Sequence, residues 1–103
     1  MKRRHVSVDP DARNDLAELH RWISRHGAPK SATAYIRRIQ AFARSLELAA
    51  ERGTSLDPVD PGLRVIPFES VVLAVRVRAT EVVVVRVLHA GRDWRCILSD
   101  DSD

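Results

Sequence analysis

Residues Val82 to Asp93 read Val-Val-Val-Val-Arg-Val-Leu-His-Ala-Gly-Arg-Asp. A β-branched run of this length predicts a buried strand, because valine side chains pack well on a pleated surface. Arg86 nevertheless lies inside the run, and His89, Arg92 and Asp93 follow at its end. Burying a charged side chain in or next to a core strand costs free energy unless the charge is paired or takes part in binding. This strand is therefore the first place where function is expected.

The segments around this strand predict a small sheet. Val71 to Arg78 is also β-branched, and Ala79-Thr80 stands between it and Val82 to His89, which predicts a hairpin even without an Asn-Gly turn. Leu63 to Pro67 predicts a shorter strand. Trp94 to Leu98 either extends the last strand or turns back on it.

The first half of the chain predicts two helices. Asp9 and Pro10 suit the start of the first helix, and Gly27 suits its end. The second helix is expected from Pro29 to Arg52. Apolar residues recur at helical spacing in both, and Trp22 is expected to belong to the core. The stripes are Ala12, Leu16, Leu19 and Ile23 in the first helix, and Ala32, Tyr35 or Ile36, Ile39, Phe42, Ala43 and Leu46 in the second.

Arg4 to Val8 alternates weakly and predicts a short edge strand, whereas the Pro-rich segment 54–62 predicts a loop. The predicted order is β-α-α-β-β-β. This is an α+β fold in which an N-terminal strand and an antiparallel helical hairpin pack on a small antiparallel sheet. Residues 1–98 are expected to form one domain and residues 99–103 an acidic, disordered tail.

Charge and composition narrow the choice of partner. The formal net charge is +3, and without Asp100, Asp101 and Asp103 it rises to about +6, which suits an acidic partner or an ordinary basic surface. Cys96 is the single cysteine, so no internal disulfide is expected. No signal peptide or membrane span is recognised, and a cytoplasmic location is expected. The histidines lack metal-ligand spacing, so neither a metal nor a cofactor is expected.

Both faces of the predicted hairpin are apolar, although two helices can cover only one of them. A half-covered antiparallel sheet normally alternates apolar and polar residues. With a two-residue turn, one face carries Val71, Leu73, Val75, Val77, Val82, Val84, Arg86 and Leu88, and the other carries Val72, Ala74, Arg76, Val83, Val85, Val87 and His89. Four or five aliphatic side chains left exposed on one face would mark a partner surface. The alternative is that other segments of the chain cover this face.

Several of these features together resemble the ParE/RelE toxin superfamily, and most closely its ParE-type members. The resemblance covers roughly residues 4 to 94. The motifs that carry it are Ala12…Asp15-Leu16…Ile23, Gly27…Ala32…Tyr35-Ile36…Ile39, Leu46, Pro61-Gly62-Leu63-Arg64, and Arg86-Val87-Leu88-His89-Ala90-Gly91-Arg92-Asp93. It implies the toxin of a type II toxin–antitoxin pair with the fold order given above. A cognate ParD-like antitoxin would neutralise this toxin.

The resemblance leaves two molecular actions open. ParE-type toxins poison DNA gyrase by binding it, whereas RelE-type relatives are ribosome-dependent endoribonucleases. RNA cleavage needs proton transfer and positive charge on the phosphate. Arg64 and Arg86 stand at positions that match those relatives and could hold a phosphate, and His89 could act as an acid or base, but no Lys follows Lys30. The chain is therefore predicted to act by binding, with the ribonuclease as the alternative and a non-toxic homodimeric module built on the valine face as a third possibility.

The resemblance also implies the site residues. Arg64, Arg86, His89, Arg92 and Trp94 are the predicted target-binding residues. Each also has a structural interpretation: Arg64 and Arg86 as arginines paired with Glu69 or Glu81 or bound to loop carbonyls, and His89 as the residue that closes its strand. Arg92 and Asp93 could form an internal pair, and Trp94 could cap the core. The predicted antitoxin-binding residues are Val72, Ala74, Arg76, Val83 and Val85.

Overall fold

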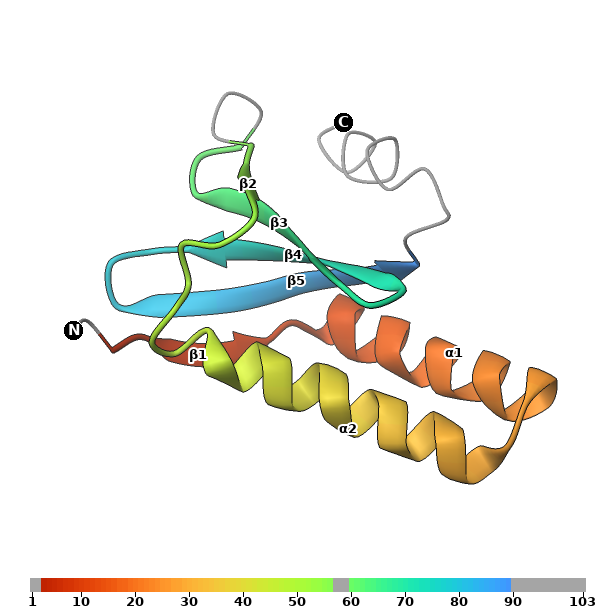
Figure 1. Cartoon of the computed structure of the whole chain (residues 1–103). Coiled ribbons are helices and arrows are strands. Elements are labelled where there is room, and N and C mark those ends of the chain that lie inside the picture. The colour runs from red at the N-terminus through yellow and green to blue at the C-terminus, as the bar shows by residue number, and fades with distance from the viewer. Residues whose placement is uncertain (1–2, 57–59, 90–103) are drawn as a thin grey trace.

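The computed structural model of the chain describes residues 3–56 and 60–89. Figure 1 shows two helices side by side on one side of a five-stranded sheet. The predicted α+β class and its order of helices and main strands are confirmed. The elements are β1 (His5–Val8), α1 (Pro10–His26), α2 (Pro29–Ser45), β2 (Thr54–Ser55), β3 (Leu63–Phe68), β4 (Val71–Val77) and β5 (Glu81–His89).

The sheet is mixed, with the strand order β1-β5-β4-β3-β2. β3, β4 and β5 pair antiparallel as predicted, but β1 pairs parallel with β5. The prediction of an antiparallel sheet is therefore wrong at this edge. Parallel neighbours need a long connection, and the helical hairpin together with β2, β3 and β4 forms it. β2 also lies within the segment predicted as a loop, where it pairs with β3.

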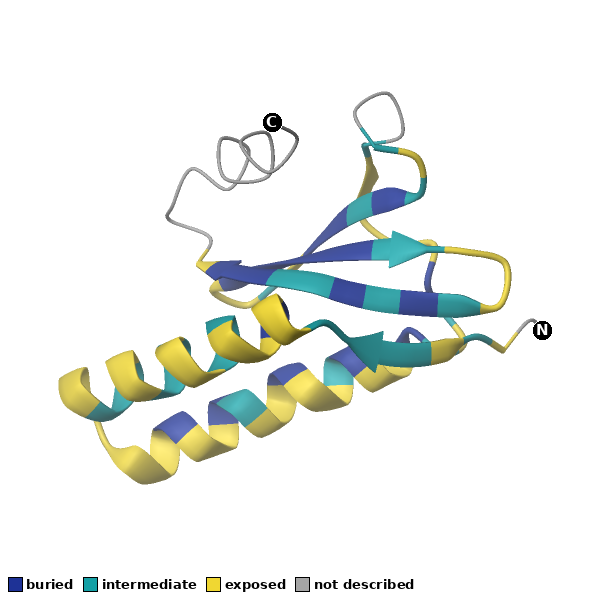
Figure 2. Cartoon of the chain, turned by 180° about the vertical axis from the view of Figure 1, so that it is seen from behind, coloured by how far each residue is buried: buried dark blue, intermediate teal, exposed yellow. Residues whose placement is uncertain are grey.

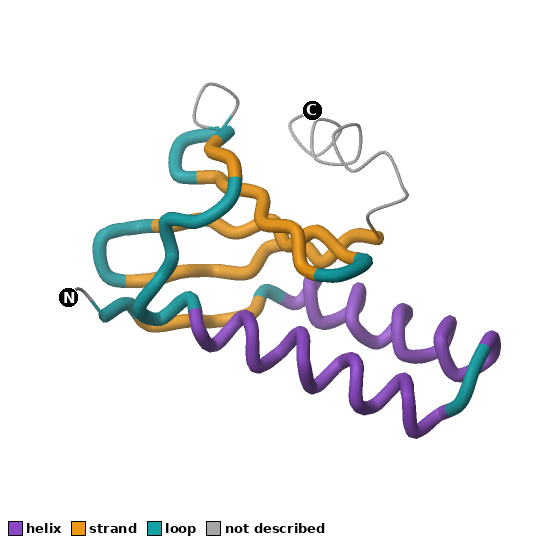
Figure 3. The backbone as a smooth tube through the Cα atoms, viewed as in Figure 1, coloured by secondary structure: helices purple, strands orange, loops and turns teal. Residues whose placement is uncertain are grey.

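Both helices begin where the sequence predicts, and Figure 3 shows the short loop between them. Pro10 and Pro29 are the first residues of α1 and α2. Asp9 occupies the N-cap position, although its side chain makes no capping hydrogen bond. α2 ends at Ser45, earlier than predicted, because the following turns close with short-range hydrogen bonds and the Glu47 carbonyl accepts the Arg4 amide at 2.8 Å.

The main core lies between the helices and one face of the sheet. Ile39 and Leu46 pack there with Leu73, Val75 and other strand residues, all nearly inaccessible to water. Figure 2 shows that the helices keep exposed residues on their outer sides. Burying each such aliphatic side chain contributes roughly 1.5–3 kcal/mol. The predicted helical stripes therefore supply one side of this core and β4 and β5 supply the other.

A β-bulge at Val85 changes which residues of β5 face the helices. Val75 lies opposite Val84, but Ala74 lies opposite Arg86, so Val85 is the extra residue. Because one extra residue reverses the alternation beyond it, Val87 joins the helix-facing core and Leu88 lies opposite Val72. The predicted faces of Arg86, Val87, Leu88 and His89 are wrong for this reason, since Arg86 lies opposite Ala74 and His89 lies opposite Val71.

The second face of the sheet is closed at its centre. Val72 and Ala74 are 6% and 0% exposed, and they form a smaller cluster with Leu63 and Val65 of β3. Leu56 and Val85 pack partly buried against it. Leu56 reaches this cluster because its amide donates to the Leu63 carbonyl at 2.8 Å. The prediction that four or five aliphatic side chains stand exposed on this face is therefore wrong.

Candidate functional site

The outer edge of β5 has two different neighbours along its length. β1 covers its first half, where the register ends with Val8 opposite Val84. The chain then leaves the sheet, with the Asp9 amide donating to the Val84 carbonyl at 2.9 Å, and enters α1. Beyond this point a side chain of α1, Asp15, serves as the hydrogen-bond acceptor for β5.

Asp15 binds β5 through three hydrogen bonds. Its Oδ2 accepts the Val87 amide at 2.8 Å and Arg86 Nε at 2.8 Å, and its Oδ1 accepts Arg86 Nη2 at 3.2 Å. The Asp15 and Arg86 side chains are 12% and 23% exposed. A bidentate pair with little solvent access is among the stronger ion pairs. Arg86 is thus paired, as its structural interpretation requires, but its partner is Asp15 where Glu69 or Glu81 was predicted.

A groove of 420 Å³ opens beside this ion pair, between α1 and the adjoining ends of β4 and β5. Its walls are apolar, with carboxylates and two rings among the lining residues. The described lining residues are Asp15, Glu18, Leu19, Trp22, Val71, Val87, Leu88 and His89. The volume lies within the range of about 300–1,000 Å³ that is typical of ligand pockets. The site therefore has both apolar surface and charge for a ligand.

Trp22 lies at this groove and is 52% exposed, so its predicted place in the core is wrong. Its ring stacks on His26 with centroids 4.2 Å apart, and the His89 ring is 6.2 Å away. His26 Nδ1 lies 2.9 Å from the Trp22 carbonyl oxygen. Trp22 lies at the end of the described sheet, beside His89, the last residue of β5. His89 is itself exposed.

Arg64 is bound to main-chain carbonyls after α2. Its Nε donates to the Arg52 carbonyl at 2.7 Å and its Nη2 to the Gly53 carbonyl at 3.3 Å. Gly53 has a φ of +69°, and a Cβ there would collide with the Val65 carbonyl. This glycine brings the carbonyl-bearing segment close to β3. The arrangement matches the structural interpretation of Arg64.

The structure does not bring Arg64 and Arg86 together. Arg64 lies opposite Val75 on β4, and Arg86 lies opposite the preceding residue, Ala74. Successive residues of a strand point to opposite faces, so the two arginines start from opposite faces of the sheet. Their guanidinium groups bind acceptors after α2 and on α1, respectively. His89, in contrast, lines the same groove as the Asp15 carboxylate that holds Arg86.

The predicted antitoxin-binding residues divide into a buried centre and a partly exposed border. Val72 and Ala74 form the centre described above. Val83 and Val85 are half-buried, and Arg76 Nη2 binds Asp60 Oδ2 at 2.5 Å. Arg92 and Trp94, and the acidic segment 99–103, lie outside the described residues.

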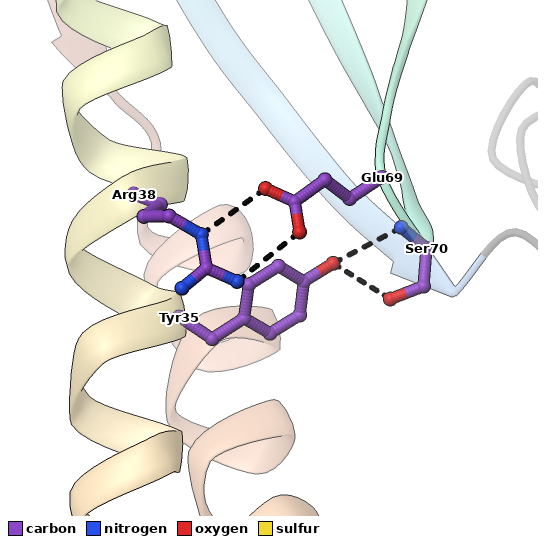
Figure 4. A network of polar contacts seen from close by, with 4 residues as sticks. All are labelled: Tyr35, Arg38, Glu69 and Ser70. Atoms are coloured by element: carbon purple, nitrogen blue, oxygen red, sulfur yellow. Dashed lines mark hydrogen bonds and ion pairs between the residues drawn. The ribbon is translucent and has the colours of Figure 1, made fainter.

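A polar network ties α2 to the turn between β3 and β4 (Figure 4). Tyr35 Oη lies 2.6 Å from Ser70 Oγ and accepts the Ser70 amide at 3.1 Å. Arg38 makes a bidentate pair with Glu69, with both contacts at 3.1 Å. Hydrogen bonding to Glu69 raises the pKa of Arg38 above its usual value. Glu69 has a φ of +52°, a conformation that favours glycine.

Sequence reasoning missed Asp15 and Glu18 as site residues. Asp15 follows Ala12 by three residues and precedes Leu19 by four, so it lies on the apolar side of α1. A carboxylate on an apolar stripe, together with an arginine inside a valine strand, was the signal that could have paired Asp15 with Arg86. Glu18 gave no such signal, because it reads as an ordinary solvated residue.

Within residues 3–56 and 60–89, no three His, Cys, Asp or Glu side chains come together in a way that could hold a metal ion. In the same part of the chain, neither helix has the length and apolar character needed to cross a membrane.

A helical hairpin packed on one face of a mixed sheet is the fold of a solved toxin–antitoxin structure. That structure, "Chromosomal ParDE TA system from P. aeruginosa", superposes with a TM-score of 0.72 at 19% identity. The match covers 84% of this chain and 95% of that chain. The family model described as "ParE toxin of type II toxin-antitoxin system, parDE" matches residues 6–94. The chain therefore belongs to the ParE toxin family, as the resemblance implied. No curated protein matches it.

Proposed function

We propose that this ParE-family toxin acts by binding protein partners and not by catalysis with its own residues. Its target would be DNA gyrase, and a ParD-like antitoxin would neutralise it. The observation that carries this proposal is the family match over residues 6–94.

The positions of the basic side chains favour binding over RNA cleavage. A ribonuclease needs cations that converge on one phosphate, with proton donors and acceptors beside it. Arg86 is paired with Asp15, and Arg64 is bound to carbonyls on another part of the molecule. A carboxylate next to the phosphate-binding cation would also repel the substrate. These contacts support a structural role for both arginines.

The centre of the valine face is buried, so an antitoxin would contact its border. Arg76, Val83 and Val85 remain partly accessible around it. The neighbouring structure is titled a ParDE system, which favours a ParD-like partner for this chain as well. A lasting complex is expected to bury more than the standard interface area of about 1,600 Å².

A gyrase assay tests the target. The purified protein is added to gyrase and relaxed plasmid, and both supercoiling and trapped cleaved DNA are measured. We expect inhibition with accumulation of cleaved DNA at micromolar protein. Absence of both effects from a folded sample would reject gyrase as the target.

Expression in bacterial cells separates the proposal from the ribonuclease alternative. Controlled induction should stop growth while translated messages stay intact, and co-expression of a cognate ParD-like antitoxin should restore growth. Cleavage of messages inside codons, lost in His89→Ala, would instead establish the ribonuclease. Growth that is unaffected by the toxin, with a dimer in solution, would favour the non-toxic homodimer.

A further inference from the structure

We propose that the groove between α1 and β5 binds a basic side chain, arginine or lysine, that a partner protein inserts into it. This inference rests on the proposed action through protein partners. Its test needs neither gyrase nor an antitoxin, so its failure can be told apart from theirs. Three features of the groove favour such a ligand: its apolar walls, the exposed ring of Trp22 and the charge of Glu18.

The walls of the groove suit the stem of a long side chain. Leu19 comes from α1, and Val71, Val87 and Leu88 come from the adjoining ends of β4 and β5. Arginine and lysine bury their methylene stems on apolar surface while keeping the charged head near water. A volume of 420 Å³ leaves room for such a side chain and part of the backbone that carries it.

Trp22 supplies an aromatic face for the cation. The indole is stacked on His26, which holds the ring in one orientation, and yet half of the residue is open to solvent. Tryptophan is the best aromatic partner for a guanidinium or an ammonium group. An exposed tryptophan held in place at a groove is also the kind of residue that anchors a partner chain.

Glu18 gives the groove an excess of negative charge. Asp15 is already neutralised by Arg86, but Glu18 is exposed and forms no ion pair with any residue in 3–56 or 60–89. His26 and His89 are the other titratable side chains at the ring of Trp22. An apolar groove with one unneutralised carboxylate discriminates in favour of a cation. The whole chain has a net positive charge, which by itself would repel a cation, so the preference for a cation is local to the groove.

The test uses two small probes of nearly the same size and shape, of which only one is charged. N-acetyl-arginine N-methylamide is titrated into the ¹⁵N-labelled full chain at millimolar concentration, and its citrulline counterpart serves as the neutral control. Trp22→Phe identifies the indole N–H signal of Trp22. We expect that signal to shift and saturate with the arginine probe. Binding of the citrulline probe should be about three- to tenfold weaker.

Glu18→Gln and Glu51→Gln form a matched pair of variants. Both remove one exposed carboxylate, but Glu51 lies away from the groove, near Arg4. Glu18→Gln should weaken the arginine probe about three- to tenfold, and Glu51→Gln should leave it unchanged. Equal weakening by both variants would mean that overall charge is responsible, which would overturn the proposal.

Three further outcomes would overturn it. Equal binding of the two probes would show that the groove accepts neutral chains. No shift of the Trp22 indole signal with either probe would show that the groove binds neither probe. Binding seen only after Arg92→Ala and Arg95→Ala would show that the chain's own C-terminal segment is the occupant.

Discussion

Asp15 of α1 binds Arg86 of β5 through both carboxylate oxygens and also accepts the amide of Val87. One side chain thereby takes the place of the strand residue that β1 would supply if it continued. It ends the hydrogen-bonding edge of β5 and fixes α1 against the sheet at the same point. Arg86, the charged residue in the valine strand, therefore serves first to hold α1 against the edge of β5.

Asp15→Ala should lower the free energy of unfolding by about 2–3 kcal/mol, because Arg86 and the Val87 amide both lose their acceptor while only partly exposed. Asp15→Asn should cost less, since its amide oxygen can still accept one of these bonds. Urea unfolding monitored by circular dichroism measures both. The control is Asp11→Asn in the exposed first turn of α1, where a loss of at most about 1 kcal/mol is expected. Similar losses at positions 11 and 15 would show that the ion pair is unimportant.

Tyr35→Phe should destabilise the protein by about 1–2 kcal/mol, because the phenol hydroxyl makes two hydrogen bonds to Ser70 while the ring itself stays buried. Ser70→Ala keeps the bond from the Ser70 amide and should cost about half as much. Thermal unfolding of the three proteins ranks them. The network is contradicted if Ser70→Ala is the more harmful of the two.

Glu69→Gly and Glu69→Ala separate backbone strain from the ion pair with Arg38. Both substitutions remove the carboxylate, but only alanine must keep a Cβ at a φ of +52°. Glu69→Gly should therefore be more stable than Glu69→Ala by about 1 kcal/mol. Adding Arg38→Ala to either variant should cost only about 0.5–1 kcal/mol more, because the carboxylate is already gone and Arg38 keeps only its contact with the Tyr35 ring. Urea midpoints test this, and equal midpoints for glycine and alanine would argue against the strained turn.

Trp22→Ala should cost about 1 kcal/mol or less, because the side chain is half exposed and loses mainly its stack on His26. Ile39→Ala, which empties a fully buried position on α2, should cost about 2–5 kcal/mol. A large loss at Trp22 would mean that the residue belongs to the core after all. A small loss makes Trp22→Ala a clean variant for binding experiments.

The order of the elements could be predicted because each segment carries its own periodic signal. The apolar stripe of α2 through Tyr35 and Ile39 and the β-branched runs of β4 and β5 depend on local sequence. The parallel pairing of β1 could not be predicted in this way, since four alternating residues say nothing about the direction of a neighbour. Just after the early end of α2, the Glu47 carbonyl accepts the amide of Arg4, which is far away in the chain and gives no local signal.

The candidate site was harder to predict than the fold. Arg86 was recognised as unusual because it interrupts valines, but its partner lies 71 residues away. Helical periodicity places Trp22 next to Ile23 of the apolar stripe, but periodicity does not show which part of α1 the sheet covers. The groove forms where α1 passes the last described residues of β5, and local sequence does not reveal this position.

The bulge at Val85 bears on how this chain should be compared with its relatives. A relative whose last strand lacks the extra residue must be aligned with a single-residue gap at this position. Without the gap, each position from Arg86 to His89 would be matched to a residue pointing the opposite way. Apparent substitutions of arginine by valine would then be errors of alignment and not changes of chemistry.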